Sequence, residues 1–191
     1  MSGSENEVIL LIRTCRLLYK NRFVRGSQGN ASIRLSPDRI LIKPSGKSFR
    51  DLRSSDLISV DMTGKLLQAC GKPSIETPVH LAIYKTRRDV KVVLHTHPLN
   101  VIKFSLLKSP LKLSEAEKNT GIVPFVRYLK PGSKELASAV SKEIKQNDAV
   151  ILAKHGLITV GKNVTEAYDL IEVVEKNAEI QNRVRARGTM A

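Results

Sequence analysis

Tryptophan is absent from this chain, and aromatic residues make up only 4% of its 191 positions. Aromatic platforms that could stack on nucleic-acid bases are therefore scarce. The chain has only two cysteines, Cys15 and Cys70, which form neither a disulfide framework nor a zinc-binding spacing. No apolar run approaches the length of about 20 residues that a membrane-spanning helix needs. These absences argue against a disulfide-stapled scaffold, a membrane protein and a base-stacking nucleic-acid binder.

Acidic side chains are also few: 18 aspartates and glutamates accompany 32 lysines and arginines, which gives a net charge of +14. A basic nucleic-acid-binding protein is therefore the non-enzyme alternative. Against it, the basic residues are spread along the chain rather than gathered in one arm. Positive charge also attracts small anions such as sugar phosphates.

The rest of the composition is that of an ordinary globular protein, with 41% apolar and 26% charged residues. A chain of this length can bury one sizeable core, and we expect a single domain over residues 1–191. The first seven residues are polar and acidic and lack the basic-then-apolar order of a signal peptide. We therefore expect a cytoplasmic protein.

Three of the four histidines follow short apolar runs. His95 and His97 come directly after the run at residues 90–94. His155 follows the run at residues 149–153. Side chains alternate along a strand, so His95 and His97 point to the same face. Two strands ending in histidine can bring three imidazoles to one sheet edge, which is how a catalytic zinc is held with an open fourth position. The alternatives are ordinary hydrogen-bonded histidines, or a copper, iron or nickel site, since imidazole suits these metals too.

Hydrophobic periodicity predicts helices and strands over the whole chain. The predicted helices cover residues 8–19, 77–86, 99–107, 133–145 and 163–185. The predicted strands cover residues 31–35, 40–42, 57–62, 66–69, 90–94, 122–128, 149–153 and 157–160. Thr77 is predicted to cap the second helix, with Pro78 in its first turn. His80, inside that helix, is interpreted as structural or as a neighbour of the metal ligands. Hairpins mixed with single helices predict a mixed or largely antiparallel sheet with helices on its faces.

Two glycine-containing loops could bind an anion. In Gly29-Asn30 and Ser45-Gly46, the glycine leaves backbone N–H groups accessible, and Asn and Ser add donors. The alternative is that these are simple turns, because the same residues are common in turns. Glu76 precedes the predicted helix 77–86, where a carboxylate can merely interact with the helix dipole. Beside a metal, it could instead serve as a ligand or transfer a proton.

The ordered set Gly29-Asn30, Ser45-Gly46, Ser74-x-Glu76, His95-x-His97 and His155-Gly156 resembles the class II aldolase family. The resemblance runs from about residue 10 to about residue 179. It implies an α/β fold with three α/β/α layers around a central, largely antiparallel mixed sheet. It also implies a homotetramer with active sites at subunit interfaces.

The resemblance assigns roles by position. His95, His97 and His155 look like the ligands of one Zn²⁺ per subunit, and Glu76 looks like the acid/base that also approaches the metal. The phosphate-binding residues would be Gly29, Asn30, Ser45, Gly46 and Ser74. The implied reaction cleaves a ketose 1-phosphate, of the L-fuculose 1-phosphate type, to dihydroxyacetone phosphate and an aldehyde such as L-lactaldehyde. A ribulose-phosphate 4-epimerase or a methylthioribulose-1-phosphate dehydratase stays open, although the epimerases typically carry aspartate where this chain has Glu76.

The chain departs from the family pattern in three places. Ile75 stands where a second hydroxyl residue is common, so one contact to the substrate is missing or comes from the backbone. Residues 113–121 lack the tyrosine that the fuculose-phosphate aldolase takes from a neighbouring subunit, and Glu115 and Glu117 are candidate proton donors there. Residues 182–191 lack a further tyrosine.

Overall fold

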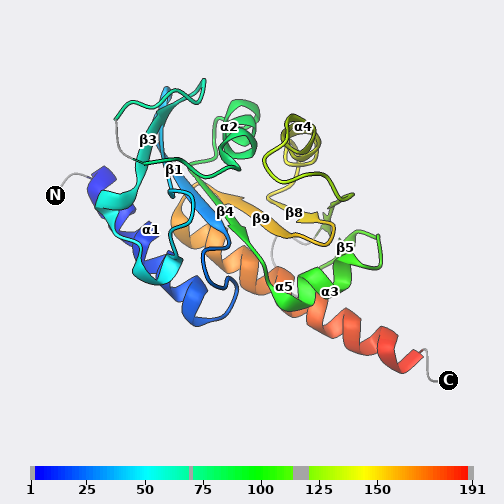
Figure 1. The fold of residues 1–191 in the computed structure, drawn as a ribbon. Coiled ribbons are helices and arrows are strands. Elements are labelled where there is room, and N and C mark those ends of the chain that lie inside the picture. The colour runs from blue at the N-terminus through cyan, green and yellow to red at the C-terminus, as the bar shows by residue number, and fades with distance from the viewer. Residues whose placement is uncertain (1–2, 69–70, 114–120, 189–191) are drawn as a thin grey trace.

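A seven-stranded sheet forms the centre of the computed structural model, which describes residues 3–68, 71–113 and 121–188 (Figure 1). In spatial order its strands are β3 (Ile58–Asp61), β2 (Arg39–Ile42), β1 (Asn30–Ser36), β4 (Val92–Thr96), β9 (Gly156–Gly161), β8 (Ala149–Leu152) and β7 (Phe125–Val126). Every neighbouring pair is antiparallel except β7 and β8, which are parallel. The predicted mixed, largely antiparallel sheet is therefore confirmed.

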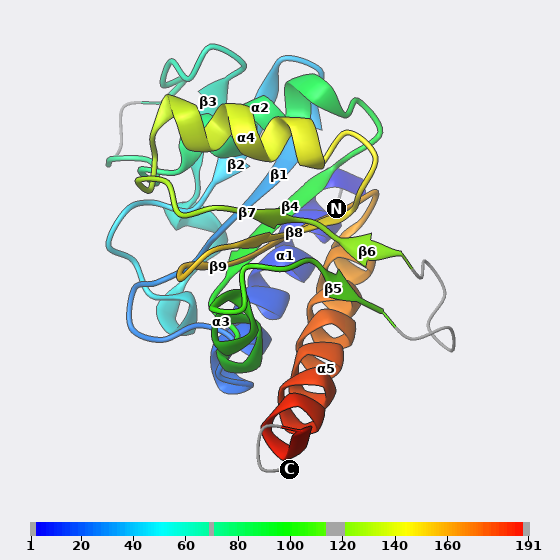
Figure 2. The ribbon, with the colours of Figure 1, turned by 90° about the vertical axis from the view of Figure 1, so that its right-hand side faces the viewer.

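Helices cover both faces of the sheet (Figures 1 and 2). One face carries α1 (Gly3–Lys20), α3 (Leu99–Ser105) and α5 (Val164–Gly188), and the other carries α2 (Thr77–Thr86) and α4 (Lys134–Glu143). Two short 3₁₀ helices (Phe49–Asp51 and Ser54–Asp56) and a small ribbon of β5 (Leu111–Lys112) and β6 (Ile122–Val123) complete the described elements. The three layers are those that the family resemblance implies. Within the described ranges, no helix is long and apolar enough to cross a membrane.

Side chains alternate along β4 between the hydrophobic cores on the two faces of the sheet, and this alternation determines the face on which His95 lies. Val92 and Leu94 are buried against α1, α3 and α5, whereas Val93 is buried against α2 and α4. Successive side chains point to opposite faces of a strand, so His95 lies on the same side as Val93. The helix α2 begins on that side, and Glu76 is the residue that precedes it.

Three local predictions were wrong. Residues 66–68 form no second hairpin strand: Leu66 makes only one isolated bridge to Val60, and Leu66 and Leu67 are exposed, so no buried face supports a strand. The predicted strand 122–128 is split, because Pro124 has no N–H to donate to a ladder. Its two parts join different sheets, β6 with β5 and β7 with β8.

The start of α2 also differs from the prediction. Glu76, not Thr77, is the residue that precedes the first helical turn, and its side chain makes no capping hydrogen bond. Thr77 Oγ1 instead donates to Ser74 O at 2.6 Å. Because the Glu76 carboxylate does not cap α2, it is available for other contacts.

Candidate active site

The three histidines converge on one point at the edge of the α2 side of the sheet. His95 lies inside β4, His97 follows the end of that strand, and His155 lies in the turn between β8 and β9. Because β4 and β9 are neighbours, this turn folds back beside His95. His95 Nε2 lies 3.0 Å from His97 Nε2 and 3.2 Å from His155 Nε2. All their ligand atoms lie within 4.8 Å of one another.

Backbone contacts fix the direction of these imidazoles. His95 Nδ1 donates to Leu157 O at 3.0 Å, so its Nε2 presents a lone pair. His97 N donates to Phe23 O at 2.7 Å. Gly156 packs directly against the pair: a Cβ there would lie 2.8 Å from His97 Cδ2 and 2.2 Å from Thr96 O. A side chain at position 156 would therefore disturb the histidine cluster.

All three imidazoles are set to be neutral. Burial lowers the pKa of His95 well below its ordinary value and lowers the pKa of His97 to about 2, and the neighbouring histidines add to both shifts. Burial also lowers the pKa of His155, against an opposing effect of Glu76. Neutral imidazole is the form that binds a metal. Three lone pairs facing one another favour a cation between them.

Glu76 faces the same point. It is 3% exposed, with Oε2 at 3.5 Å from His95 Nε2 and Oε1 at 3.7 Å from His155 Nε2. Neither oxygen receives a hydrogen bond of ordinary geometry among the described residues, although the Asn30 side chain and the Gly132 N–H approach the carboxylate. Burial raises the pKa of Glu76, while His155, the Asn30 side chain and the Gly132 N–H favour its charged form. A buried carboxylate beside three neutral imidazoles fits a divalent cation.

A cavity of about 210 Å³ opens beside this cluster. Its lining includes Glu76 and the three histidines, together with the residues predicted for phosphate: Gly29, Asn30, Ser45, Gly46 and Ser74. Gly29 and Gly46 have φ of +73° and +75°, the left-handed conformation that favours glycine. A Cβ at Gly29 would also lie 2.9 Å from His95 O. The structure thus brings the three histidines, Glu76 and the five residues predicted for phosphate to one cavity.

Comparison with known proteins identifies the family. The model of the class II aldolase and adducin N-terminal domain matches residues 9–182. This chain belongs to the class II aldolase family. An L-fuculose phosphate aldolase of Methanococcus maripaludis is 41% identical over 171 residues, 88% of this chain and 92% of that protein. A solved structure of an L-fuculose 1-phosphate aldolase superposes with a TM-score of 0.86 at 27% identity, covering 98% of this chain and 89% of the other.

A second activity occurs among the relatives of this class II aldolase. A 3-oxo-tetronate 4-phosphate decarboxylase of Haemophilus influenzae is 30% identical over 184 residues, 90% of this chain and 84% of that protein. The family relation therefore brings more than one reaction on sugar phosphates into consideration.

Lys43 is a site residue of this aldolase domain that sequence reasoning missed. It is 2% exposed and lines the cavity. Its Nζ donates to Ser27 O at 3.2 Å, Pro44 O at 3.3 Å and Lys47 O at 2.6 Å, which ties the two glycine loops together. Burial lowers its pKa to about 8. The partners of Lys43 Nζ in the described part of the chain are these three carbonyls, so no carboxylate neutralises its charge directly. Lys43 directly follows β2, and its sequence neighbours do not reveal that its side chain is buried.

The loop at residues 131–132 is the second missed part of the site. Pro131 lines the cavity, and Gly132 has φ +73°. A Cβ at Gly132 would lie 2.6 Å from Ile75 O, so only glycine allows this close approach next to Glu76. The sequence analysis did not single out Pro131-Gly132, because nothing local reveals which distant segment this pair contacts. Glu115 and Glu117 lie outside the described residues.

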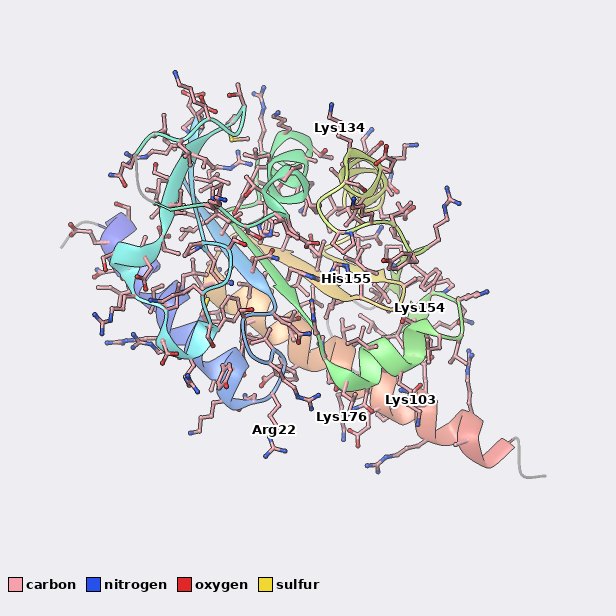
Figure 3. All side chains as sticks on the ribbon, viewed as in Figure 1. Arg22, Lys103, Lys134, Lys154, His155 and Lys176 are labelled. Carbon is pink, nitrogen blue, oxygen red and sulfur yellow. The ribbon has the colours of Figure 1, made fainter. Side chains whose placement is uncertain are left out.

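The basic side chains of this aldolase domain are not gathered on one face. Figure 3 shows Lys134 on α4, Lys103 on α3 and Lys176 on α5, at the outside of helices on opposite faces of the sheet. His155 lies instead beside the sheet, between these layers (Figure 3).

Proposed function

We propose that this class II aldolase cleaves a ketose 1-phosphate of the L-fuculose 1-phosphate type to dihydroxyacetone phosphate and an aldehyde such as L-lactaldehyde. The observation that carries the proposal is the set of three neutral imidazoles and one buried carboxylate at a cavity lined by two glycine loops. The similarity to L-fuculose phosphate aldolases supports the same substrate class.

Zn²⁺ is the metal we propose for His95, His97 and His155, with Glu76 close enough to approach the same ion. Three imidazoles and one carboxylate are ligands that zinc accepts. When bound, the ion supplies a Lewis acid that stabilises negative charge on the substrate's oxygens. The hydrogen bond from His95 Nδ1 to Leu157 O keeps that imidazole oriented toward the ion throughout.

Glu76 is the proposed acid/base. The C4 hydroxyl loses its proton to solvent as its oxygen becomes the aldehyde carbonyl, and the C3–C4 bond breaks with its electron pair left on C3. Glu76 then gives a proton to C3 to complete dihydroxyacetone phosphate. In the condensation direction the Glu76 carboxylate removes the same proton. Burial raises the pKa of Glu76, which brings a carboxyl group closer to the range where it can both give and take a proton near neutral pH.

The phosphate of the substrate is proposed to bind between the two glycine loops. Gly29 and Gly46 leave space for an anion next to the backbone, and Asn30 and Ser74 add side-chain donors. The three N–H groups of Lys43 are already directed to backbone carbonyls, so Lys43 acts through its charge and by holding the loops. This charge lies in a site with low solvent access, where it attracts an anion more strongly than at the surface.

The assembly and the compartment belong to the same proposal. We propose a homotetramer with the sites at subunit interfaces, because the cavity is open in the single chain. A partner subunit would then supply the groups that replace the missing tyrosines. A cytoplasmic location agrees with Cys15, a free and buried thiol. Nucleic acid and membranes are not proposed as partners.

The first experiment is elemental analysis of the purified protein together with an assay for dihydroxyacetone phosphate release from L-fuculose 1-phosphate. We expect about one zinc per chain and release that stops with a chelator and returns with zinc. Zinc without release from this substrate would contradict the aldolase assignment, and product analysis with ribulose 5-phosphate, methylthioribulose 1-phosphate and 3-oxo-tetronate 4-phosphate would then identify the reaction. Absence of metal after zinc is added back would contradict the metal site itself.

A further inference from the structure

A line of buried hydrogen bonds runs from the interior of the protein to the wall of the cavity. On β1, Asn30 and Ser32 are two residues apart and face α2; on α2, His80 and Tyr84 are four residues apart and face β1. All four side chains are buried, with His80 at 0% exposure. Residues two apart on the strand therefore lie opposite residues four apart on the helix. The proposed proton transfer uses neither His80 nor Tyr84.

The contacts are continuous. Tyr84 OH lies 2.8 Å from Ser32 Oγ, and Ser32 Oγ lies 2.6 Å from His80 Nδ1. On its other side, His80 Nε2 forms a hydrogen bond with Asn30 Oδ1. Asn30 pairs with His95 across the neighbouring strands and lines the cavity beside Glu76. One side chain of the proposed phosphate site is therefore connected to His80 directly.

The direction of the bonds follows from the Glu76 end, because the Glu76 carboxylate only accepts and the Asn30 side chain favours its charged form, which puts the NH₂ group of Asn30 on that side and Oδ1 on the side of His80. Burial lowers the pKa of His80 to about 3, so the ring is neutral and carries one N–H. Because Asn30 Oδ1 can only accept, the proton is on Nε2, and Nδ1 accepts from the Ser32 hydroxyl. Because the Ser32 proton goes to His80, the Ser32 oxygen accepts from the Tyr84 hydroxyl, whose one proton then points to Ser32 at 2.8 Å rather than to Lys91 O at 3.3 Å. With Oδ1 held by His80, the NH₂ group of Asn30 faces the opposite way, toward Glu76 and the cavity.

The orientation of the Asn30 amide determines whether hydrogen-bond donors or an acceptor face an anion in the cavity. The NH₂ group presents donors that suit a phosphate and the Glu76 carboxylate, and the Asn30 side chain does favour the charged form of Glu76. The reversed amide would present an oxygen to two anions, which is repulsive. An amide differs little in shape between its two orientations, so a hydrogen-bond partner has to choose between them.

We infer that His80 is a positioning residue: its Nε2–H holds the Asn30 amide so that the NH₂ donors point into the cavity, where they bind the phosphate of the substrate. This inference rests on the proposed function of the cavity. His80 itself touches no part of the substrate and acts through Asn30 only.

A matched pair of variants tests this. The side-chain nitrogen of Gln can replace Nε2 of histidine, so His80→Gln keeps a donor for Asn30. Asn is shorter and reaches only the position of Nδ1, so His80→Asn keeps the contact to Ser32 and loses the donor. We expect inorganic phosphate to bind His80→Gln within about threefold of the parent and His80→Asn about tenfold to a hundredfold more weakly, since a hydrogen bond to a charged group is at stake. Zinc content should be the same in all three proteins.

Two further measurements separate positioning from general damage. In the background of Asn30→Ala, the two variants of His80 should bind phosphate equally, because the side chain that transmits the effect is gone. Long-range ¹H–¹⁵N NMR of the unmodified protein should show the His80 ring protonated at Nε2 and not at Nδ1. This measurement needs no variant and so does not depend on whether the variants fold.

Equal phosphate affinity of His80→Gln and His80→Asn would overturn the inference. A proton on Nδ1, or a difference that persists in the Asn30→Ala background, would also overturn it. Phosphate binding does not require cleavage, so the two proposals fail separately. If the variants follow the expected order but the parent protein releases no dihydroxyacetone phosphate, the aldolase proposal fails and the positioning role of His80 stands.

Discussion

Replacing Gly156 with alanine would place a methyl group between β9 and the histidines of β4. An ideal Cβ at this position lies 2.2 Å from Thr96 O, 2.8 Å from His97 Cδ2 and 3.2 Å from His95 Cε1. The first distance is more than about 1 Å shorter than an ordinary van der Waals contact between heavy atoms. The obstructing atom is a backbone oxygen at the end of β4, so it cannot rotate away as a side chain would.

The expected cost follows from how the clash can be relieved. Overpacking usually costs about 1–3 kcal/mol of stability, and separation of two central strands belongs at the upper end of that range. For a chain of this size, about 3 kcal/mol corresponds to a fall in Tm of about 6–12 °C. The same displacement moves His95 relative to His97, so zinc affinity should fall by at least about tenfold.

Thermal unfolding of the metal-free protein, followed by circular dichroism, measures the first effect, and a competitive chelator titration measures the second. Gly121→Ala is the matched control, because a Cβ at Gly121 meets nothing within 4 Å and this residue does not have a positive φ. Its Tm should change by no more than about 2 °C. If Gly156→Ala also keeps its Tm within this margin and binds zinc as tightly as the parent, the packing argument is refuted.

Three other predictions concern single side chains. Glu76→Gln should keep its zinc and lose about 100- to 10,000-fold in turnover. His95→Ala should lose zinc and turnover together, and an equal zinc content in His95→Ala and the parent would exclude His95 as a ligand. Lys43→Met removes a positive charge from the cavity and should raise KM for the sugar phosphate about tenfold with a smaller effect on kcat, so an unchanged KM would contradict its role. The His80 pKa of about 3 means that below pH 6.5 the unfolded chain takes up a proton that the folded chain does not. The free energy of unfolding of the metal-free protein should therefore fall with decreasing pH between about 6 and 3. His80→Gln should reduce the slope of this free energy against pH by about 1.4 kcal/mol per pH unit. Equal slopes for the parent and the variant in urea titrations would disprove the buried neutral state of His80.

The histidine cluster could be predicted because two short-range patterns were enough. Alternation along a strand puts His95 and His97 on one face, and the end of a second apolar run brings His155 to the same sheet. For Gly29 and Gly46 the sequence left an anion-binding loop and a plain turn open, and both residues have the positive φ that glycine adopts without strain. Residues 66–69 and 122–128 were misread because their apolar residues fit a strand locally. One lacked a face to bury, and Pro124 divided the other.

Lys43, Gly132 and the role of His80 could not be predicted, because each depends on a partner far away in the sequence. A lysine directly after a strand gives no sign that three backbone carbonyls will surround its Nζ. Gly132 is needed only because Ile75 O lies against it. His80 occupies an ordinary helical position until the register of β1 against α2 places Ser32 on one ring nitrogen and Asn30 on the other.

The sequence by itself determined the candidate residues of the site, since ligand type, strand alternation and the conformational freedom of glycine are properties of short segments. Only the tertiary structure decided the electrostatic state of those residues. Burial makes the imidazoles neutral and raises the pKa of Glu76, and the lost solvent is also what lowers the pKa of Lys43. Desolvation depends on everything that packs around a group, and so it exists only once the three layers have come together.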